Sequence, residues 1–179
     1  MTKQDFVSLL QAYKPSAEEE LFKERKLAFV AEYANCFDRS LEIGHITASC
    51  WLLSKDKKKA LLMHHTKLDQ WFQLGGHCDG NPDVLAVALK EAQEESGINH
   101  IVPVNTHIFD IDIHLIPANK KEKEHYHYDV RFLLQVASDE KIVQNSESKE
   151  LRWITKNRAE FPTQNRSVVR MFDKWIALK

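Results

Sequence analysis

The chain has 179 residues, of which 43% are hydrophobic and 28% are charged, and its formal net charge is −1. This is the composition of an ordinary globular protein, and the length suits one domain with an appendage. Because the charges nearly cancel, we expect no basic field that would attract a nucleic acid polymer or a membrane surface. No stretch is long and apolar enough to span a bilayer, and the N-terminus lacks the apolar run of a signal peptide.

The three cysteines, Cys36, Cys50 and Cys78, are widely spaced and odd in number. They form no CxxC pair, so the sequence predicts neither a disulfide framework nor a zinc site. A reducing, cytoplasmic location is therefore the expectation.

The first 40 residues are predicted to form a helical extension. Pro15 interrupts the first helix, and Ser16 is predicted to cap a second helix that ends near residues 35–39. We expect residues 1–40 to pack against a domain formed by residues 41–179. Contacts within a homodimer, or closure of the substrate site, are alternative roles for this extension.

The character of the sequence changes at His45. The β-branched and aromatic run HITASCWLLS (45–54) is followed, after a polar turn, by KKALLMHH (58–65). This pattern predicts two strands joined as a hairpin. The segment WFQLGGH (71–77) predicts a further short strand.

A glycine turn followed by a helix is predicted for residues 75–98. Asn81 is expected to cap the helix and Pro82 to be its first residue. Asp83 places a negative charge at the positive end of the helix dipole. Gly97 is predicted to end the helix in a left-handed conformation.

Three carboxylates of this helix, Glu91, Glu94 and Glu95, converge on one face, because residues three and four apart are neighbours on a helix. They repel one another unless a cation neutralises them, and Mg²⁺ or Mn²⁺ is the natural partner of such oxygen ligands. The Gly75–Gly76 backbone can approach closely, so the Gly76 carbonyl is a further candidate ligand. The alternative is a solvated acidic surface. An apolar stripe beside the carboxylates is predicted to dock the helix on a core: Leu85, Ala88, Leu89 and Ala92.

This stretch resembles the signature of the Nudix hydrolase family (MutT-like). The residues that fall in register with the signature are Gly76, Glu91, Ala92, Glu94, Glu95, Gly97 and Ile98. The resemblance implies that Glu91, Glu94 and Glu95 bind the divalent ion. It also implies an α/β fold, namely a Nudix-type α/β/α sandwich with a mixed, partly antiparallel sheet, to which the helical extension is added.

The match departs from the family pattern at two positions. Pro82 stands where the family has its first Glu, with Asp83 beside it as a partial substitute. Lys90 stands where the family has Arg, which keeps the charge but loses the planar fork that orients a carboxylate at two points. These departures bear on the catalytic rate more than on the type of reaction.

Two later segments, HIFDIDIHLIP (107–117) and HYHYDVRFLLQV (125–136), alternate between polar and apolar residues and predict an antiparallel hairpin with one polar face. In the resembling proteins such strands line the cleft beside the metal helix. This implies substrate contacts for Asp112, His127, Asp129 and Arg131, and His77 could reach a substrate phosphate. A sheet surface that faces solvent is the alternative.

The histidines allow a second interpretation. His125 and His127 share a strand face and, with Asp129, could form a transition-metal site. No histidine spacing in the sequence is diagnostic, so a zinc or iron site is not predicted. The adjacent His64 and His65 point to opposite faces and make no joint site.

The C-terminal part contributes one strand, a helix from Thr163 onwards, and an acidic loop. In the resembling proteins an acidic residue in the loop before a late Trp-bearing strand often completes the active site. Glu147, six residues before Trp153, is the candidate, and Glu150 is the alternative. The basic residues of the tail are predicted to be solvated: Arg158, Arg166, Arg170 and Lys174.

The function implied is Mg²⁺-dependent hydrolysis of a pyrophosphate bond in a nucleoside diphosphate linked to another moiety. Glu94, Glu147 and Lys90 are the candidate catalytic residues. Two alternatives stay open. One is an enzyme like the isoprenoid-diphosphate isomerases, with Cys78 as nucleophile. The other is a non-catalytic nucleotide-binding module that has kept the fold.

Overall fold

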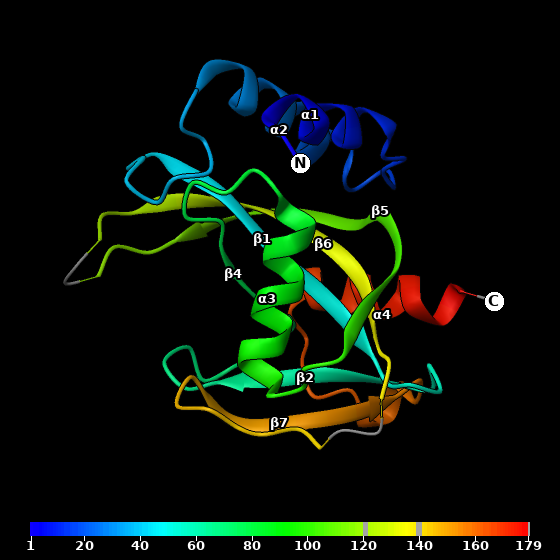
Figure 1. The fold of residues 1–179 in the computed structure, drawn as a ribbon. Coiled ribbons are helices and arrows are strands. Elements are labelled where there is room, and N and C mark those ends of the chain that lie inside the picture. The colour runs from blue at the N-terminus through cyan, green and yellow to red at the C-terminus, as the bar shows by residue number, and fades with distance from the viewer. Residues whose placement is uncertain (120–121, 139–140, 179) are drawn as a thin grey trace.

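The computed structural model describes residues 1–119, 122–138 and 141–178. Two helices come first, followed by strands that flank a central helix, and a fourth helix ends the chain (Figure 1). The helices are α1 (Lys3–Ala12), α2 (Glu20–Glu32), α3 (Val84–Ser96) and α4 (Arg166–Ala177), with a short 3₁₀ helix at Arg158–Glu160. The strands are β1 (Gly44–Leu53), β2 (Lys59–His65), β3 (Trp71–Phe72), β4 (Leu74–His77), β5 (Ile101–Ile116), β6 (His125–Val136) and β7 (Ser148–Thr155).

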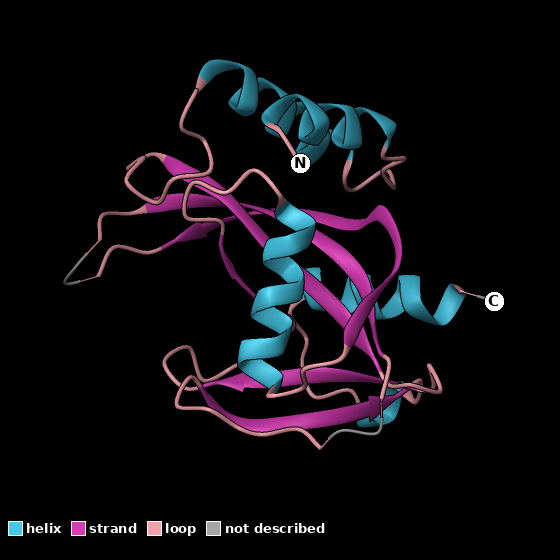
Figure 2. Ribbon diagram, viewed as in Figure 1, coloured by secondary structure: helices cyan, strands magenta, loops and turns pink. Residues whose placement is uncertain are grey.

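The strands form one mixed sheet in the order β3-β2-β1-β6-β5, in which β4 also pairs with β1 and β7 with β2. The central strands β1 and β6 run parallel, and the other pairs among the described residues are antiparallel. Strand β1 pairs with β2 only at Leu52 and Leu53 and with β4 over Thr47–Cys50. The sheet therefore curls, and β2 and β7 separate from the β1–β6 part (Figures 1 and 2).

Both predicted hairpins are confirmed, with corrected limits. Strand β5 begins at Ile101, earlier than the alternating segment suggested, and pairs with β6 through two irregularities of register. The segment 71–77 is not one strand, because β3 pairs with β2 whereas β4 pairs with β1. A change of partner at Gln73 thus interrupts it.

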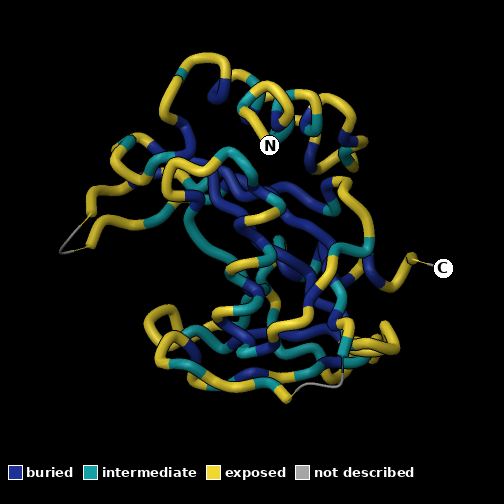
Figure 3. Tube along the Cα trace, viewed as in Figure 1, coloured by how far each residue is buried: buried dark blue, intermediate teal, exposed yellow. Residues whose placement is uncertain are grey.

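Helices cover both faces of the sheet, as the predicted α/β/α sandwich requires. Helix α3 packs on the face that carries Ile46, Ala48 and Cys50, and α4 packs on the opposite face. All ten residues of β1 are buried, because it runs between the two layers (Figure 3). The predicted inner side of α4 is confirmed, since four residues are buried there: Val168, Met171, Phe172 and Trp175. Within the described part of the chain, no helix has the length and apolar character needed to cross a membrane.

Buried apolar side chains of α1 and α2 belong to the same hydrophobic cluster as those of α3. The Phe29 ring stacks on Tyr128 of β6 with centroids 4.0 Å apart. The prediction that Ser16 caps α2 is wrong. Instead, Ser16 donates to the Glu19 carboxylate through its backbone N–H (2.9 Å) and its hydroxyl (2.7 Å), and α2 begins only at Glu20.

The division of the chain into a helical extension and a second domain near residue 40 stays a prediction.

The start of α3 also differs from the prediction. The helix begins at Val84, and the Asp83 side chain caps it by accepting the N–H of Ala86 at 3.1 Å. The Asn81 side chain instead accepts the N–H of Asp83, which stabilises the turn before the helix. The expected roles of Asn81 and Pro82 were therefore wrong, because Asp83 is an equally good capping residue closer to the helix. The C-terminal prediction is confirmed, since Gly97 has a φ of 71°.

Candidate active site

The candidate site lies where β4 passes α3. Gly76 of β4 faces Glu91, and a Cβ at residue 76 would come within 2.5 Å of Glu91 Oε2. Only glycine lets the backbone approach the carboxylate this closely. The Gly76 backbone and the Glu91 carboxylate are thereby held as neighbours.

Glu95 is the most buried of the three carboxylates, at 4% exposure. It accepts the backbone N–H of Gly75 at 2.8 Å. Burial, together with the charges of Glu91 and Glu147, raises the pKa of Glu95 to about 8 against the lowering effect of the bond from Gly75. A buried carboxyl of this kind exchanges its proton for a cation readily, since either neutralises it.

Lys90 links the other two carboxylates. Its ammonium lies 3.2 Å from Glu91 Oε1 and 2.9 Å from Glu94 Oε2. Burial raises the pKa of Glu91, Lys90 lowers it, and the charges of Glu94 and Glu147 raise it again. Because Lys90 and Glu94 are both exposed, their ion pair is weak and Glu94 can leave it at little energetic cost.

Glu147 belongs to a loop that docks on the end of α3. The Val143 N–H donates to the Ser96 carbonyl at 2.7 Å, and the Asn145 side-chain amide donates to the Glu94 carbonyl at 3.2 Å. Asn145 also accepts the N–H of Glu147 at 2.9 Å. The loop that carries Glu147 is therefore fixed beside the end of α3. The Glu147 charge raises the pKa of both Glu91 and Glu95.

Glu150 lies apart from this group. It projects from β7, is exposed, and pairs with Arg152 at 2.8 Å. Of the two acidic candidates before Trp153, the structure thus brings only Glu147 to the carboxylate face.

The oxygen set of Glu91, Glu94, Glu95 and the Gly76 carbonyl fits a hard divalent ion chemically. Two observations support the fit: the contact that a Cβ at Gly76 would fill, and the raised pKa of Glu95. The oxygens are not gathered as tightly as the ligands of one ion, since Lys90 lies between Glu91 and Glu94 in this structure. Movement of the exposed Glu94 would complete the set.

The polar face of β5 and β6 lies on the other side of the sheet from α3. The alternative of a solvent-facing sheet surface is wrong for four of its residues, because Asp110, Asp112, Asp129 and Arg131 are all buried. Arg131 donates to Asp129 at 2.7 Å and to Asp110 at 3.0 Å. Buried charges persist only when they are paired in this way.

Helix α4 and the N-terminal segment close this ion network. Arg170 donates to Asp110 at 2.8 Å, and Lys174 donates to Glu19 at 2.6 Å. The expectation that Arg170 and Lys174 are solvated was therefore wrong, because both neutralise buried carboxylates. Burial raises the pKa of Glu19, but bonds from Lys174 and Tyr13 outweigh it and bring the pKa to about 2.

Substrate contacts by Asp112, Asp129 and Arg131 stay a prediction. Burial raises the pKa of Asp112, but the bond to His114 and the charge of Arg131 hold it well below its usual range. These groups are fully engaged with one another, so a substrate could reach them only if the network opened.

The structure also brings His45 and His77 to the pair formed by His125 and His127 on one face of β6. The rings of His45, His77, His125 and His127 lie next to one another, with centroids of neighbouring rings 4.9–5.1 Å apart. His45 was missed, because a single histidine at the start of an apolar strand carries no motif. Asp129, once considered as their partner, bonds instead to Thr47, Ser49 and Arg131.

Cys78 is buried beside this region, at 3% exposure. Burial raises its pKa, and nearby negative charges raise it further. A thiol in this environment is a poor nucleophile.

An α/β/α fold with a carboxylate-bearing helix after a glycine turn defines a class of metal-dependent hydrolases. Residues 44–175 match the family model described as NUDIX domain. The chain belongs to the Nudix family, whose members are generally pyrophosphohydrolases, typically use divalent metals and bind nucleotide-type small molecules. A search of curated proteins gave no match.

Solved structures show the same fold. A Nudix-family hydrolase from Clostridium perfringens superposes with a TM-score of 0.56 and 23% identity, covering 75% of this chain and 98% of that one. The Caenorhabditis elegans Ap4A hydrolase gives a TM-score of 0.51 and 18% identity, covering 74% and 95%. The Escherichia coli dihydroneopterin triphosphate pyrophosphohydrolase gives 0.54 and 15%, covering 72% and 92%.

Proposed function

We propose that this protein is a Mg²⁺-dependent hydrolase that cleaves a pyrophosphate bond in a nucleoside diphosphate linked to another moiety. The observation that carries the proposal is the group formed by Gly76, Glu91, Glu94 and Glu95, in which a glycine backbone lies against one carboxylate and a second is buried with a raised pKa. Mn²⁺ would suit the same oxygens.

Each residue of the site has a role in this proposal. Glu91, Glu94, Glu95 and the Gly76 carbonyl hold the ion, which when bound supplies charge neutralisation for the pyrophosphate and lowers the pKa of water. Lys90 keeps Glu91 and Glu94 together. Glu147 takes the proton from the attacking water, because it lies on the carboxylate face without belonging to α3.

The substrate class rests on the family and on its structural relatives. By their names, two of these relatives act on Ap4A and on dihydroneopterin triphosphate. Both compounds contain several phosphates that are linked to one another. His77 and His127 stay candidate substrate contacts by the resemblance alone, because the side chain of His77 points to the face of β4 opposite Glu91. The leaving group stays open.

The test is Mg²⁺-dependent phosphate release from a panel of nucleotides, nucleotide sugars and dinucleoside polyphosphates. Glu94→Gln and Glu95→Gln should each nearly abolish turnover with the fold intact, because an amide is a poor ligand for a hard cation. Wild-type turnover in either variant would refute the metal assignment.

The alternative functions make different predictions in the same assay. An isomerase would consume an isoprenoid diphosphate without releasing phosphate, and the buried Cys78 speaks against it. A binding module would bind nucleotides, measured by calorimetry, without turnover of any of them.

We place the protein in a reducing cytoplasm, because Cys36, Cys50 and Cys78 are buried free thiols. A homodimer stays a prediction, to be measured by sedimentation.

A further inference from the structure

His45 is a buried polar side chain without a partner. Its residue is 3% exposed, and neither ring nitrogen forms a hydrogen bond with any described residue. The backbone of Leu41 lies close enough to raise the pKa of the ring, but this contact lacks hydrogen-bond geometry. An unpaired buried polar group destabilises the fold, so a native protein that keeps one needs a reason.

The topology places two more histidines beside it. His45 of β1 pairs in register with His127 of β6, and the neighbouring Thr47 pairs with His77 of β4. One nitrogen from each of His45, His77 and His127 lies within 4.8 Å of the other two. Three strands that are distant in the sequence thus direct three imidazoles at one point.

His125 adds a fourth imidazole with a defined orientation. Its Nδ1 lies 2.7 Å from the Lys123 carbonyl, so Nδ1 carries the hydrogen and Nε2 of the neutral ring presents a lone pair. That Nε2 lies within hydrogen-bond distance of His127 Nε2, at 3.3 Å. His125 is thus a neighbour of the group formed by His45, His77 and His127 without belonging to it. A histidine that binds a metal usually donates the N–H of its other ring nitrogen to a carbonyl or carboxylate. His125 Nδ1 has such a partner in the Lys123 carbonyl.

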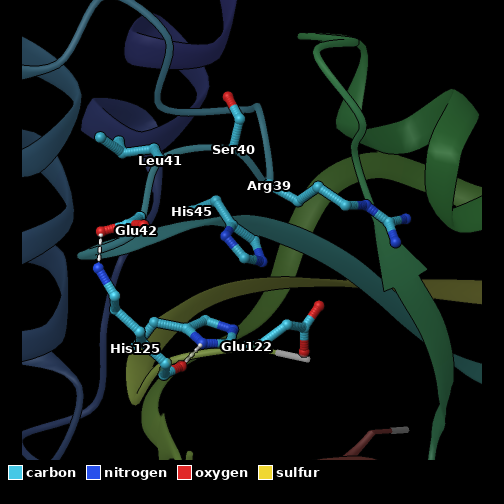
Figure 4. A pocket seen from close by; sticks show the side chains of 8 residues that line it. Arg39, Ser40, Leu41, Glu42, His45, Glu122 and His125 are labelled. Atoms are coloured by element: carbon cyan, nitrogen blue, oxygen red, sulfur yellow. Dashed lines mark hydrogen bonds and ion pairs between the residues drawn. The ribbon is translucent and has the colours of Figure 1, made fainter. Parts of the chain in front are cut away.

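A pocket gives access to two of these rings, His45 and His125. It has a volume of about 290 Å³, and His45 and His125 form part of its wall together with Glu42, Glu122 and Lys123 (Figure 4). In Figure 4 the His45 and His125 rings both project into this space. An ion could therefore enter without unfolding of the sheet.

We propose that His45, His77 and His127 bind one divalent transition-metal ion of the Zn²⁺ type, with His125 as the adjacent fourth imidazole. Neutral imidazoles are favoured ligands of such ions, whereas Mg²⁺ prefers oxygens. The ion would tie β4 to β1 and β6 and provide the partner that His45 lacks.

This site is separate from the carboxylate face. Successive residues of a strand point to opposite sides of a sheet. In β4, Gly76 faces Glu91 of α3, and His77 faces the histidines. The proposal goes beyond the hydrolase function and does not depend on it.

The other explanation is a cluster of neutral histidines with no ligand. Burial, together with the charges of His77 and His125, lowers the pKa of His45 to about 4, so the ring is neutral at pH 7 under either explanation. The two explanations differ in what His45→Leu does. Under either explanation, replacing the unpaired imidazole by a side chain of similar size should not destabilise the protein in EDTA. Only the proposal expects the substitution to remove metal binding as well.

The experiment measures metal binding without substrate. Wild-type protein stripped with EDTA is titrated with Zn²⁺ by calorimetry, and with Co²⁺ by its visible absorption, which is intense for tetrahedral sites. Melting temperatures are recorded with and without Zn²⁺. The variants are His45→Leu and His127→Gln, with the exposed His107→Gln as matched control. The double variant Glu91→Gln/Glu95→Gln removes metal binding at the carboxylates.

The proposal expects a tetrahedral Co²⁺ spectrum in wild type, in His107→Gln and in the glutamate double variant, and one Zn²⁺ per chain in the glutamate double variant. In that double variant, a hundredfold excess of Zn²⁺ over Kd should raise Tm by roughly 5 °C or more. The tetrahedral spectrum should disappear in His45→Leu and His127→Gln. A tetrahedral Co²⁺ spectrum that survives in His45→Leu, that is lost in the glutamate double variant, or that is absent from wild type would overturn the proposal.

Discussion

Gly76 of β4 lies directly against the Glu91 side chain of α3. A methyl group at residue 76 would lie 2.5 Å from Glu91 Oε2. At Gly75, by contrast, a Cβ would lie 2.1 Å from the Ser49 Cβ and 2.7 Å from the Ala48 carbonyl. The first contact is with the end of a flexible side chain, whereas the second involves the backbone of β1. The two adjacent glycines are therefore required for different reasons.

Gly76→Ala should fold with nearly unchanged Tm but displace the Glu91 carboxylate. A misplacement of about 1 Å at a catalytic group costs roughly 10²-fold in rate, so kcat/KM should fall by about that factor. Gly75→Ala should instead lower Tm strongly, because β1 must move. Equal loss of stability in both variants, measured by thermal melts beside the activity assay, would contradict this distinction.

Glu95→Gln should change how stability depends on pH. The folded pKa of about 8 lies above the ordinary value of 4.5, so the folded protein keeps a proton that the unfolded chain loses. Stability contributed by Glu95 is therefore present below pH 4.5 and is lost as pH rises to about 8, by up to ~1.4 kcal/mol per pH unit. Urea unfolding in EDTA should show this decline in wild type and a flatter profile in Glu95→Gln, which can still accept the Gly75 N–H.

Glu147→Gln and Glu150→Gln form a matched pair. Loss of a general base lowers kcat by roughly 10²–10⁴-fold, and we expect this for Glu147 at saturating Mg²⁺. Glu150 pairs with Arg152 on the exposed side of β7, so its substitution should change kcat little. A large loss only in Glu150→Gln would transfer the role to that residue.

Lys90→Arg should preserve or raise kcat, because a guanidinium can contact Glu91 and Glu94 through separate nitrogens. Lys90→Met should lower kcat without changing Tm, since an exposed ion pair stabilises the fold little. If Lys90→Arg folds but loses activity, the ammonium has a function that charge alone does not explain.

Arg170→Met should destabilise the protein by about 3–5 kcal/mol, because it leaves Asp110 and Asp112 buried without one of their cations. Arg166→Met on the same helix removes an exposed contact with Glu18 and should cost about 1 kcal/mol or less. Urea denaturation measures both. Similar values for the two variants would show that the buried network contributes little to stability.

Much of the fold followed from local patterns. The hairpins appeared as runs with a period of two, and Gly97 marked the end of α3 because its left-handed backbone suits glycine. The start of α3 was misplaced because Asn81 and Asp83 can both cap a helix, and only the path of the chain selects between them. Glu147 could be named from a motif, but its place beside Glu91 depends on the docking of its loop on α3.

The sequence by itself determined the helix that carries Glu91, Glu94 and Glu95 and the glycine turn before it, because helical geometry brings residues three and four apart together whatever surrounds them. Only the tertiary structure decided what covers each face of the sheet. Alternation predicted that Asp110 and Arg131 share a polar face, but not that α4 would bury it. It also could not show that His45 meets His127, because the parallel pairing of β1 and β6 joins segments with no local signal between them.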